Sequence, residues 1–252
     1  MTTSSSQSDA ETQHLREVLY GAYRSSFKAV AMAAPEPLTK AQTAALDRFC
    51  RPLLAGIPQT ASILDLGCGD GTLLSYLQKI GFTQAQGVDY SAEQVAAACA
   101  RGVTARQGDL FAALASAQKT YDVIFAFDVI EHMTKGELAR LGQQLRLAMR
   151  PGGLLVLQTP NGDGIGSGHV VYGDLTHETI FNDSSLAQYL RAFGFTDIRF
   201  HETGPVPHSL FGLTRWVAWK AIRAIAQGLS LVQTGRCPRI LTAVLIASCR
   251  AP

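Results

Sequence analysis

The sequence is poor in charged residues and has no apolar run long enough to span a bilayer as a helix. Only 17% of its 252 residues are charged, whereas 47% are hydrophobic. The longest apolar run, Ile240 to Cys249, is well short of the roughly 20 residues that a spanning helix needs. The polar start MTTSSSQSDAETQ lacks the basic and apolar regions of a signal peptide. We therefore expect a cytoplasmic protein, either soluble or associated with the inner face of the membrane.

Patterns that bind metal or form disulfides are also missing. The five cysteines form no CxxC pair and no zinc-like spacing with histidine; they stand at positions 50, 68, 99, 237 and 249. Such cysteine usage fits a reducing compartment. A few acidic residues could be recruited to a metal ion, but nothing in the sequence fixes their spacing; these are Asp128, Asp163 and Asp174. We expect neither a disulfide nor a bound metal.

Acidic residues are absent from the C-terminal part of the chain. Residues 203 to 252 contain six Lys or Arg and no acid, which leaves 16 basic against 20 acidic residues before them. Residues 205–238 read as an insertion containing a basic amphipathic helix. Its apolar residues recur at helical spacing and include Trp216, Trp219, Ile222 and Ile225. This helix either contacts an anionic membrane through residues 209–233 or covers the active site and buries its apolar face.

Strand and helix patterns alternate from Ala61 onward. Seven short apolar segments are separated by helical patterns, which predicts a Rossmann-like, doubly wound α/β sheet of seven strands with helices on both faces. We expect the sheet to be mostly parallel, with its last strand antiparallel. Residues 61–252 then form one domain. Residues 1–13 read as a disordered tail. Residues 14–60 read as a candidate lid made of two helices, whose patterns run from Glu11 to Ala34 and from Thr39 to Ala55.

A glycine-rich loop follows the first predicted strand. The segment DLGCGDG begins at Asp65, where the chain must turn sharply and approach a ligand closely. Thr72 replaces the third glycine of a GxGxxG dinucleotide fingerprint, which disfavours hydride transfer on NAD. Asp89 ends the second strand, where a carboxylate can accept hydrogen bonds from ribose hydroxyls. Asp109 follows the third strand and could accept a hydrogen bond from an adenine amino group. The alternative is a tight turn with Asp89 and Asp109 as helix caps.

Five segments resemble, in order, the motifs of the class I S-adenosylmethionine-dependent methyltransferase family over about residues 61 to 200. They are ILDLGCGDG, QGVDYS, ARQGDLF, YDVIFAFDVIEHM and MRPGGLLVLQTPN. The resemblance implies S-adenosylmethionine as the cofactor and S-adenosylhomocysteine as its product. It also implies a set of cofactor contacts: Gly67, Cys68 and Gly69 at the methionine part, Asp65 orienting the glycine loop, Asp89 at the ribose, Tyr90, Asp109 and Leu110 at the adenine, and Phe127 near the sulfonium.

The sequence disfavours a nucleic acid as the methyl acceptor. The fourth strand ends in FDVIEHM instead of an NPPY-like tetrapeptide, no Pro-Cys nucleophile follows, and no strongly basic face covers the catalytic part. We therefore expect a hydroxyl on a small or lipid-linked molecule, which needs a general base. His177 is the preferred base, with Asp174 or Glu178 to orient it. The alternative is that Asp174 and His177 only tie their loop to the next helix.

Glu131 and His132 follow the fourth strand and are interpreted as shaping the pocket floor.

The DLTHE loop and the insertion resemble methyltransferases of bacterial surface-polysaccharide assembly, which implies a sugar hydroxyl as the acceptor. The central motifs resemble ubiquinone-pathway methyltransferases equally well, which implies a quinone precursor. A non-catalytic scaffold that binds S-adenosylmethionine is the third hypothesis.

Overall fold

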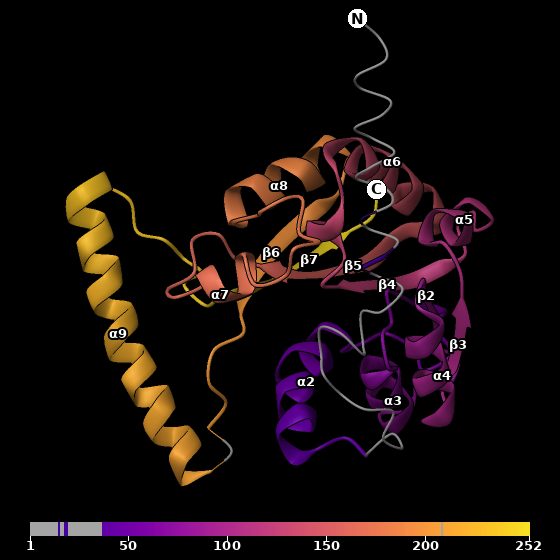
Figure 1. The fold of residues 1–252 in the computed structure, drawn as a ribbon, viewed down its shortest axis with the longest axis horizontal. Coiled ribbons are helices and arrows are strands. Elements are labelled where there is room, and N and C mark those ends of the chain that lie inside the picture. The colour runs from indigo at the N-terminus through magenta and orange to yellow at the C-terminus, as the bar shows by residue number, and fades with distance from the viewer. Residues whose placement is uncertain (1–14, 16–17, 20–36, 208) are drawn as a thin grey trace, which may run out of the picture.

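A seven-stranded sheet forms the centre of the protein (Figure 1). The computed structural model describes residues 15, 18–19, 37–207 and 209–252. The strands are β1 (Ile63–Leu66), β2 (Gln86–Asp89), β3 (Thr104–Gln107), β4 (Tyr121–Phe127), β5 (Met149–Pro160), β6 (Thr196–Glu202) and β7 (Val244–Arg250). Their order is β3-β2-β1-β4-β5-β7-β6; β7 pairs antiparallel with β5 and with β6, and the pairs among β1 to β5 are parallel. The predicted doubly wound sheet with an antiparallel last strand is confirmed.

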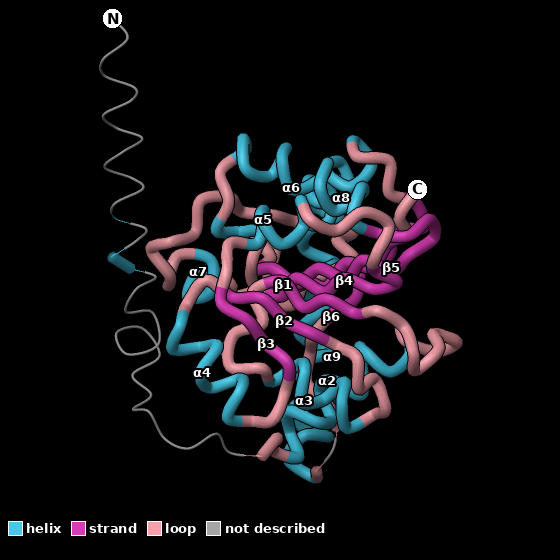
Figure 2. Tube along the Cα trace, turned by 90° about the vertical axis from the view of Figure 1, so that its right-hand side faces the viewer, coloured by secondary structure: helices cyan, strands magenta, loops and turns pink. Residues whose placement is uncertain are grey.

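Helices cover both faces of this sheet (Figure 2). One layer contains α2 (Lys40–Leu53), α3 (Thr72–Lys79) and α4 (Ala92–Ala100), and the other contains α5 (Leu110–Ala115), α6 (Lys135–Ala148) and α8 (Asp183–Ala192). Each layer packs its own hydrophobic cluster against the sheet, around the fully buried Tyr76 on one face and Leu141 on the other. The parallel strands therefore end between two packed layers, where open α/β sheets bind their ligands.

Local capping interactions fix where several helices begin. Thr39 and Thr134 each form a reciprocal capping box, with Gln42 and Glu137 respectively. At Ser91 the hydroxyl accepts from the Gln94 amide without a return bond, so only half of such a box is formed. These helices therefore begin at residues whose side chains cap the first turn.

The second of the two predicted N-terminal helices is present as α2. It packs against α3, where the Tyr76 hydroxyl donates to Asp47 at 2.8 Å. This contact makes α2 part of the covering layer of the sheet. The predicted tail and most of the helix from Glu11 to Ala34, with its role as a lid, lie outside the described residues.

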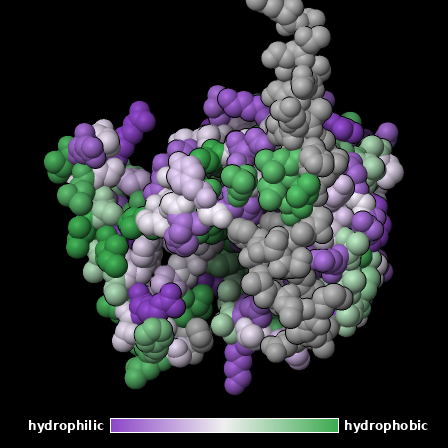
Figure 3. Space-filling model, viewed as in Figure 1, coloured by the Kyte–Doolittle hydropathy of each residue, from purple (hydrophilic) through white to green (hydrophobic). Residues whose placement is uncertain are grey.

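The predicted insertion contains a long helix, α9 (Leu210–Thr234), which stands beside the layered body (Figure 1). Only Gly212 among its residues is buried. Large apolar side chains are exposed along its outer side (Figure 3), among them Ile225 at 65%, Leu229 at 67% and Val232 at 89%. In the described part of the chain, this helix therefore does not bury its apolar face over the active site, which was one of the two expectations.

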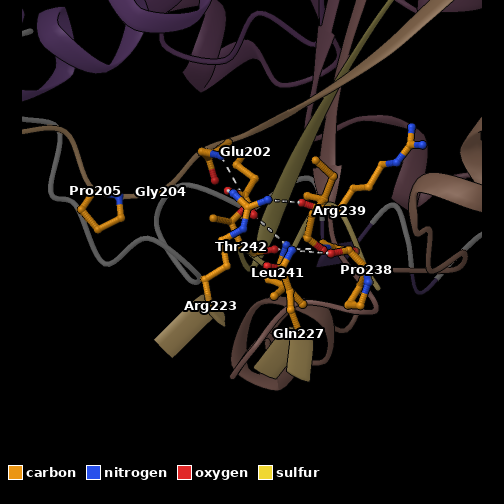
Figure 4. A network of polar contacts seen from close by, with 12 residues as sticks. Glu202, Gly204, Pro205, Arg223, Gln227, Pro238, Arg239, Leu241 and Thr242 are labelled. Carbon is orange, nitrogen blue, oxygen red and sulfur yellow. Dashed lines mark hydrogen bonds and ion pairs between the residues drawn. The ribbon is translucent and has the colours of Figure 1, made fainter. Parts of the chain in front are cut away.

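Polar contacts hold α9 to the body (Figure 4). The Arg223 guanidinium pairs with the Glu202 carboxylate and donates to the Arg239 carbonyl, and Gln227 donates to the Pro238 carbonyl. This anchorage turns one side of the helix inward.

The inward side carries the two tryptophans, Trp216 and Trp219, which are half-buried. A Cβ added at Gly204 would lie only 3.1 Å from the Trp219 indole nitrogen. Ile222 and Ile225 are exposed instead. The expectation that the tryptophans and isoleucines share one apolar face was wrong, because residues spaced by three shift steadily around a helix of 3.6 residues per turn.

Candidate active site at the carboxyl ends of the parallel strands

A cavity of about 640 Å³ opens where the parallel strands end. Nine of the sequence-predicted site residues line it: Gly67, Gly69, Asp89, Tyr90, Asp109, Leu110, Phe127, Asp174 and His177. The remaining three, Asp65, Cys68 and Glu178, are not among its lining residues. Seven of the nine proposed cofactor residues thus share one cavity with the proposed base, although they come from segments far apart in the sequence.

The glycine loop requires glycine for its backbone shape. Gly67 and Gly69 have φ of 70° and 53°, which L side chains rarely adopt. The Gly67 amide donates to the Val88 carbonyl at 2.8 Å, and a Cβ added at Gly67 would lie 2.5 Å from Cγ2 of Val129. The loop therefore turns back against the end of β2 and the residues after β4. Gly67 and Gly69 present no side chain there, which fits the close approach of a bound cofactor.

Replacing Gly67 with alanine is expected to destabilise the protein more than Gly102→Ala. Both glycines have positive φ, 70° and 80°, which costs alanine roughly 1–2 kcal/mol. Only Gly67 also has a neighbour in the way, since nothing lies within 4 Å of a Cβ at Gly102. The clash with Val129 adds roughly 1–3 kcal/mol. Urea unfolding of both variants measures the difference; equal losses would mean that Val129 moves aside without cost.

Asp89 ties the loop to the end of β2. One carboxylate oxygen accepts from the Gly69 amide at 2.9 Å, and the other accepts from the Ser91 amide at 2.9 Å. Asp89 lines the cavity, so this half-buried acid fits the role expected for a residue that binds ribose hydroxyls.

The residues predicted to bind adenine line the cavity, and one of them also caps a helix. Asp109 caps α5, because its carboxylate accepts from the Ala112 amide at 2.8 Å. The helix-cap interpretation is therefore correct for Asp109, yet the same residue lines the cavity with Leu110 and the exposed Tyr90. Phe127 lines it too and packs edge-on against Phe125, with 5.6 Å between ring centroids. A flat apolar ligand with polar edges suits these walls.

Asp65 and Cys68 lie behind the cavity wall. Asp65 is buried at the end of β1, and burial together with the nearby Asp89 raises the pKa of its carboxyl well above the usual range. Within the described residues, no hydrogen bond joins Asp65 to the glycine loop in the way expected. The Cys68 side chain packs toward β2, where its sulfur would lie 2.6 Å from a Cβ at Gly87. Burial also raises the pKa of the Cys68 thiol.

A second group of polar side chains follows β4. The 3-10 helix η2 (Ile130–His132) supplies Glu131 and His132, and the loop after α7 (Gly168–Val171) supplies His177. The two imidazole rings lie 4.8 Å apart between centroids, at 62° to each other. The Glu131 carbonyl accepts from the Glu178 and Thr179 amides at 2.7 and 2.9 Å, which ties the loop to η2. We call Glu131, His132 and His177 the Glu-His-His cluster.

Glu131 is a buried carboxyl in an unfavourable setting. It is 2% exposed, and neither carboxylate oxygen has a hydrogen-bond partner among the described residues. Burial, with smaller contributions from Asp128 and Asp174, raises its pKa well above the usual range. The buried Thr159 hydroxyl lowers this pKa slightly but does not reach hydrogen-bonding geometry. Because such carboxyls are costly to bury, one beside two histidines suggests a functional role.

The two histidines are oriented by different groups. Nδ1 of His177 contacts the Val171 carbonyl at 2.9 Å, so a backbone oxygen holds this ring in place of the expected Asp174 or Glu178. Nδ1 of His132 contacts the Thr176 hydroxyl at 2.8 Å, and this hydroxyl donates to Asp174 at 2.6 Å. Asp174 therefore positions His132. Glu178 is exposed.

The comparisons with known proteins place this geometry in a family. A family model for a methyltransferase domain matches residues 39–199. The chain is 32% identical over 125 residues to a ubiquinone biosynthesis O-methyltransferase of Mesorhizobium japonicum, covering 45% of this chain and 47% of that protein. It is 30% identical over 135 residues to a probable S-adenosylmethionine-dependent methyltransferase of Mycolicibacterium smegmatis, covering 53% and 51%. The chain thus matches about half the length of these curated relatives.

Solved structures share the fold over most of the chain. A S-adenosylmethionine-dependent methyltransferase from Archaeoglobus fulgidus superimposes with a TM-score of 0.63 at 19% identity, covering 90% of this chain and 97% of that one. The [4+2]-cyclase SpnF gives 0.60 at 19% identity, covering 96% and 97%. At these identities the likeness concerns the fold. Since the family model covers more than half of the chain, the protein belongs to the class I S-adenosylmethionine-dependent methyltransferase family.

Proposed function

We propose that this protein methylates a hydroxyl oxygen of a small or lipid-linked acceptor. The observation that carries the proposal is that His177, with its partner His132, lines the same cavity as Asp89 and the glycine loop. An alcohol must lose its proton as the methyl is transferred, and a positioned imidazole can accept that proton. A cavity that held only cofactor contacts would lack this group.

Different residues along the cavity have different roles in binding and in catalysis. S-adenosylmethionine supplies an activated methyl on a sulfonium, so the protein has to align the acceptor and exclude water. Asp89 binds the ribose hydroxyls, Gly67 and Gly69 allow close approach, and Leu110 and Phe127 provide apolar walls. His177 removes the acceptor proton.

The relatives favour a phenolic hydroxyl on a quinone precursor as the acceptor. One of them is named as an O-methyltransferase of ubiquinone biosynthesis. A sugar hydroxyl on a lipid-linked glycan is supported only by the resemblance of the DLTHE loop and the insertion. Both acceptors carry a lipid chain, which agrees with the exposed apolar side of α9.

Transfer of labelled methyl groups tests the proposal. The full chain is incubated with methyl-labelled S-adenosylmethionine and, in separate reactions, a polyprenylated dihydroxybenzene, a lipid-linked glycan and a phosphoethanolamine control. Label in the first reaction supports the quinone assignment, and label in the second supports the sugar. Binding of S-adenosylhomocysteine without transfer to any hydroxyl would contradict the proposal and favour the scaffold hypothesis.

The outer side of α9 is proposed to contact anionic membranes. No described helix is long and apolar enough to cross one. Exposed apolar residues run along the outer side of α9, with the basic Arg215 and Lys220 exposed on the same helix. This arrangement is typical of helices that lie in the membrane interface.

Replacing Ile225, Leu229 and Val232 together with serine is expected to reduce binding to anionic vesicles at least tenfold. Loss of half the burial energy of each side chain amounts to about 1 kcal/mol per residue, and 1.4 kcal/mol is a factor of ten. Vesicle flotation measures the bound fraction. Leu147→Ser, which removes an exposed leucine from α6, is the control. Equal flotation of all three proteins would rule out this face.

A further inference from the structure

We propose that the Glu-His-His cluster binds one divalent transition-metal ion in the wall of the cavity. Each of its residues offers a ligand atom, and these atoms all lie within 4.8 Å of one another. Metal ligands stand roughly 2.0–2.2 Å from zinc, so shifts of about 1 Å would bring all three onto one ion. Glu131 and His132 are adjacent on η2, and the loop carrying His177 is hydrogen-bonded to the same turn.

The buried Glu131 side chain is the strongest indication of a metal ligand. Both of its oxygens lack a hydrogen-bond partner within the described residues, although the side chain is 2% exposed. Buried polar groups are almost always partnered, and a buried carboxylate without a partner destabilises the fold. No arginine or lysine forms an ion pair with it in the described part of the chain. A cation held jointly with two imidazoles would compensate the charge.

The surroundings of the histidines prepare them as ligands. Nδ1 of His177 faces the Val171 carbonyl. Nδ1 of His132 faces the Thr176 hydroxyl, and because that hydroxyl already donates to Asp174, it can only accept from the ring. Both rings therefore carry their proton on Nδ1 when neutral, which makes Nε2 the coordinating nitrogen. Outer hydrogen bonds of this kind fix the orientation of metal-binding histidines.

The ligand types select the class of ion. Two imidazole nitrogens and one carboxylate oxygen suit Zn²⁺, Fe²⁺, Mn²⁺ or Co²⁺ better than Ca²⁺ or Mg²⁺, which prefer oxygen ligands. Three protein ligands leave at least one position open. His132, His177 and Glu131 all line the cavity, so the open position is available to a bound acceptor.

This inference rests on the proposed hydroxyl methylation and deepens it. An ion at the cluster would lower the pKa of a coordinated hydroxyl, whose proton then passes to solvent. The oxygen forms a bond to the methyl carbon, and the carbon–sulfur bond breaks with its electron pair going to the sulfur. Within this proposal His177 serves as a ligand, and the ion takes over from the free imidazole as the group that promotes loss of the acceptor proton. The proposal departs from the expectation that no metal is bound.

Binding of Co²⁺ and Zn²⁺ to the chelator-treated full chain, without an affinity tag, tests the site directly. We expect one ion per chain, with visible Co²⁺ absorption bands that Zn²⁺ abolishes. Glu131→Gln and His132→Ala are expected to weaken binding at least 100-fold. His169→Ala, which removes an exposed histidine from the same cavity, should keep the wild-type affinity.

Binding of S-adenosylhomocysteine, measured without metal, checks that each variant is folded. Absence of stoichiometric binding to wild type would overturn the metal site, as would equal affinity in Glu131→Gln. Because the titration contains no acceptor, its result stands even if no hydroxyl is ever methylated. Conversely, hydroxyl methylation at an unchanged rate in a protein shown to be metal-free would overturn the site and keep the proposed function.

Discussion

His177→Ala is expected to lower the rate of methyl transfer by about 10²–10⁴-fold, the range typical of losing a general base. The ring lines the cavity beside His132 and is held through Nδ1 by the Val171 carbonyl. Its other nitrogen is therefore the one available for chemistry. The affinity for S-adenosylhomocysteine should stay within about threefold, because His177 belongs to the second polar group and not to the glycine loop. Single-turnover transfer of labelled methyl groups measures the rate.

His169→Ala is the matched control, since His169 also lines the cavity, while its Nδ1 contacts the Gly166 carbonyl outside the Glu-His-His cluster. Its rate should stay close to that of the wild type. Retention of the full rate in His177→Ala would disprove the assignment of this residue. A rate loss in wild type on chelation, reversed by Co²⁺, would show that His177 acts by holding an ion, whereas a chelator-resistant rate would leave it as the direct base.

The fold and the cofactor loop could be predicted because their signals are local. Each strand is followed within a few residues by the group that marks its end, such as Gly67 after β1 and Asp89 at the end of β2. Parallel strands bring these ends to one edge without further information. For this reason, the order of short signals along the chain was enough to assemble that half of the site.

The Glu-His-His cluster could not be predicted in the same way. Glu131 and His132 were recognised only as pocket residues, and His177 only as a base, because no spacing rule joins a turn after β4 to a loop after β5. Their meeting depends on the hydrogen bonds from the 178 and 179 amides to the Glu131 carbonyl. Asp128, two residues before η2, has a φ of 55°, and such backbone strain concentrates at functional sites, but this signal is visible only in the structure.

The side of α9 that packs against the body could also not be predicted from the sequence. Tryptophans and isoleucines at helical spacing fit an apolar stripe. Which side meets the body depends on the distant contacts of Arg223 with Glu202 and of Trp219 with Gly204. An amphipathic pattern predicts which residues share a face of a helix. Contacts with residues distant in the sequence determine which of those faces is buried.

Asp89→Ala is expected to weaken binding of S-adenosylhomocysteine about 10- to 100-fold. Hydrogen bonds to a charged group contribute roughly 1.5–3 kcal/mol, and each 1.4 kcal/mol changes affinity tenfold. The change removes the acceptor for the ribose hydroxyls and also frees the Gly69 and Ser91 amides, which Asp89 holds at 2.9 Å. Asp89→Asn should fall between wild type and alanine, because an amide offers one uncharged oxygen. Calorimetry measures all three affinities.

Asp122→Ala separates loss of binding from loss of stability. Asp122 lies near the opposite end of β4, accepts from the Ser62 amide at 2.8 Å and pairs with Arg150. It resembles Asp89 in accepting a backbone hydrogen bond beside β1, but it does not line the cavity. Both alanine variants should therefore unfold at lower urea concentration, while only Asp89→Ala binds the cofactor product weakly. Equal affinities in the two variants would show that Asp89 supports the loop without contacting the ligand, and the ribose assignment would then fail.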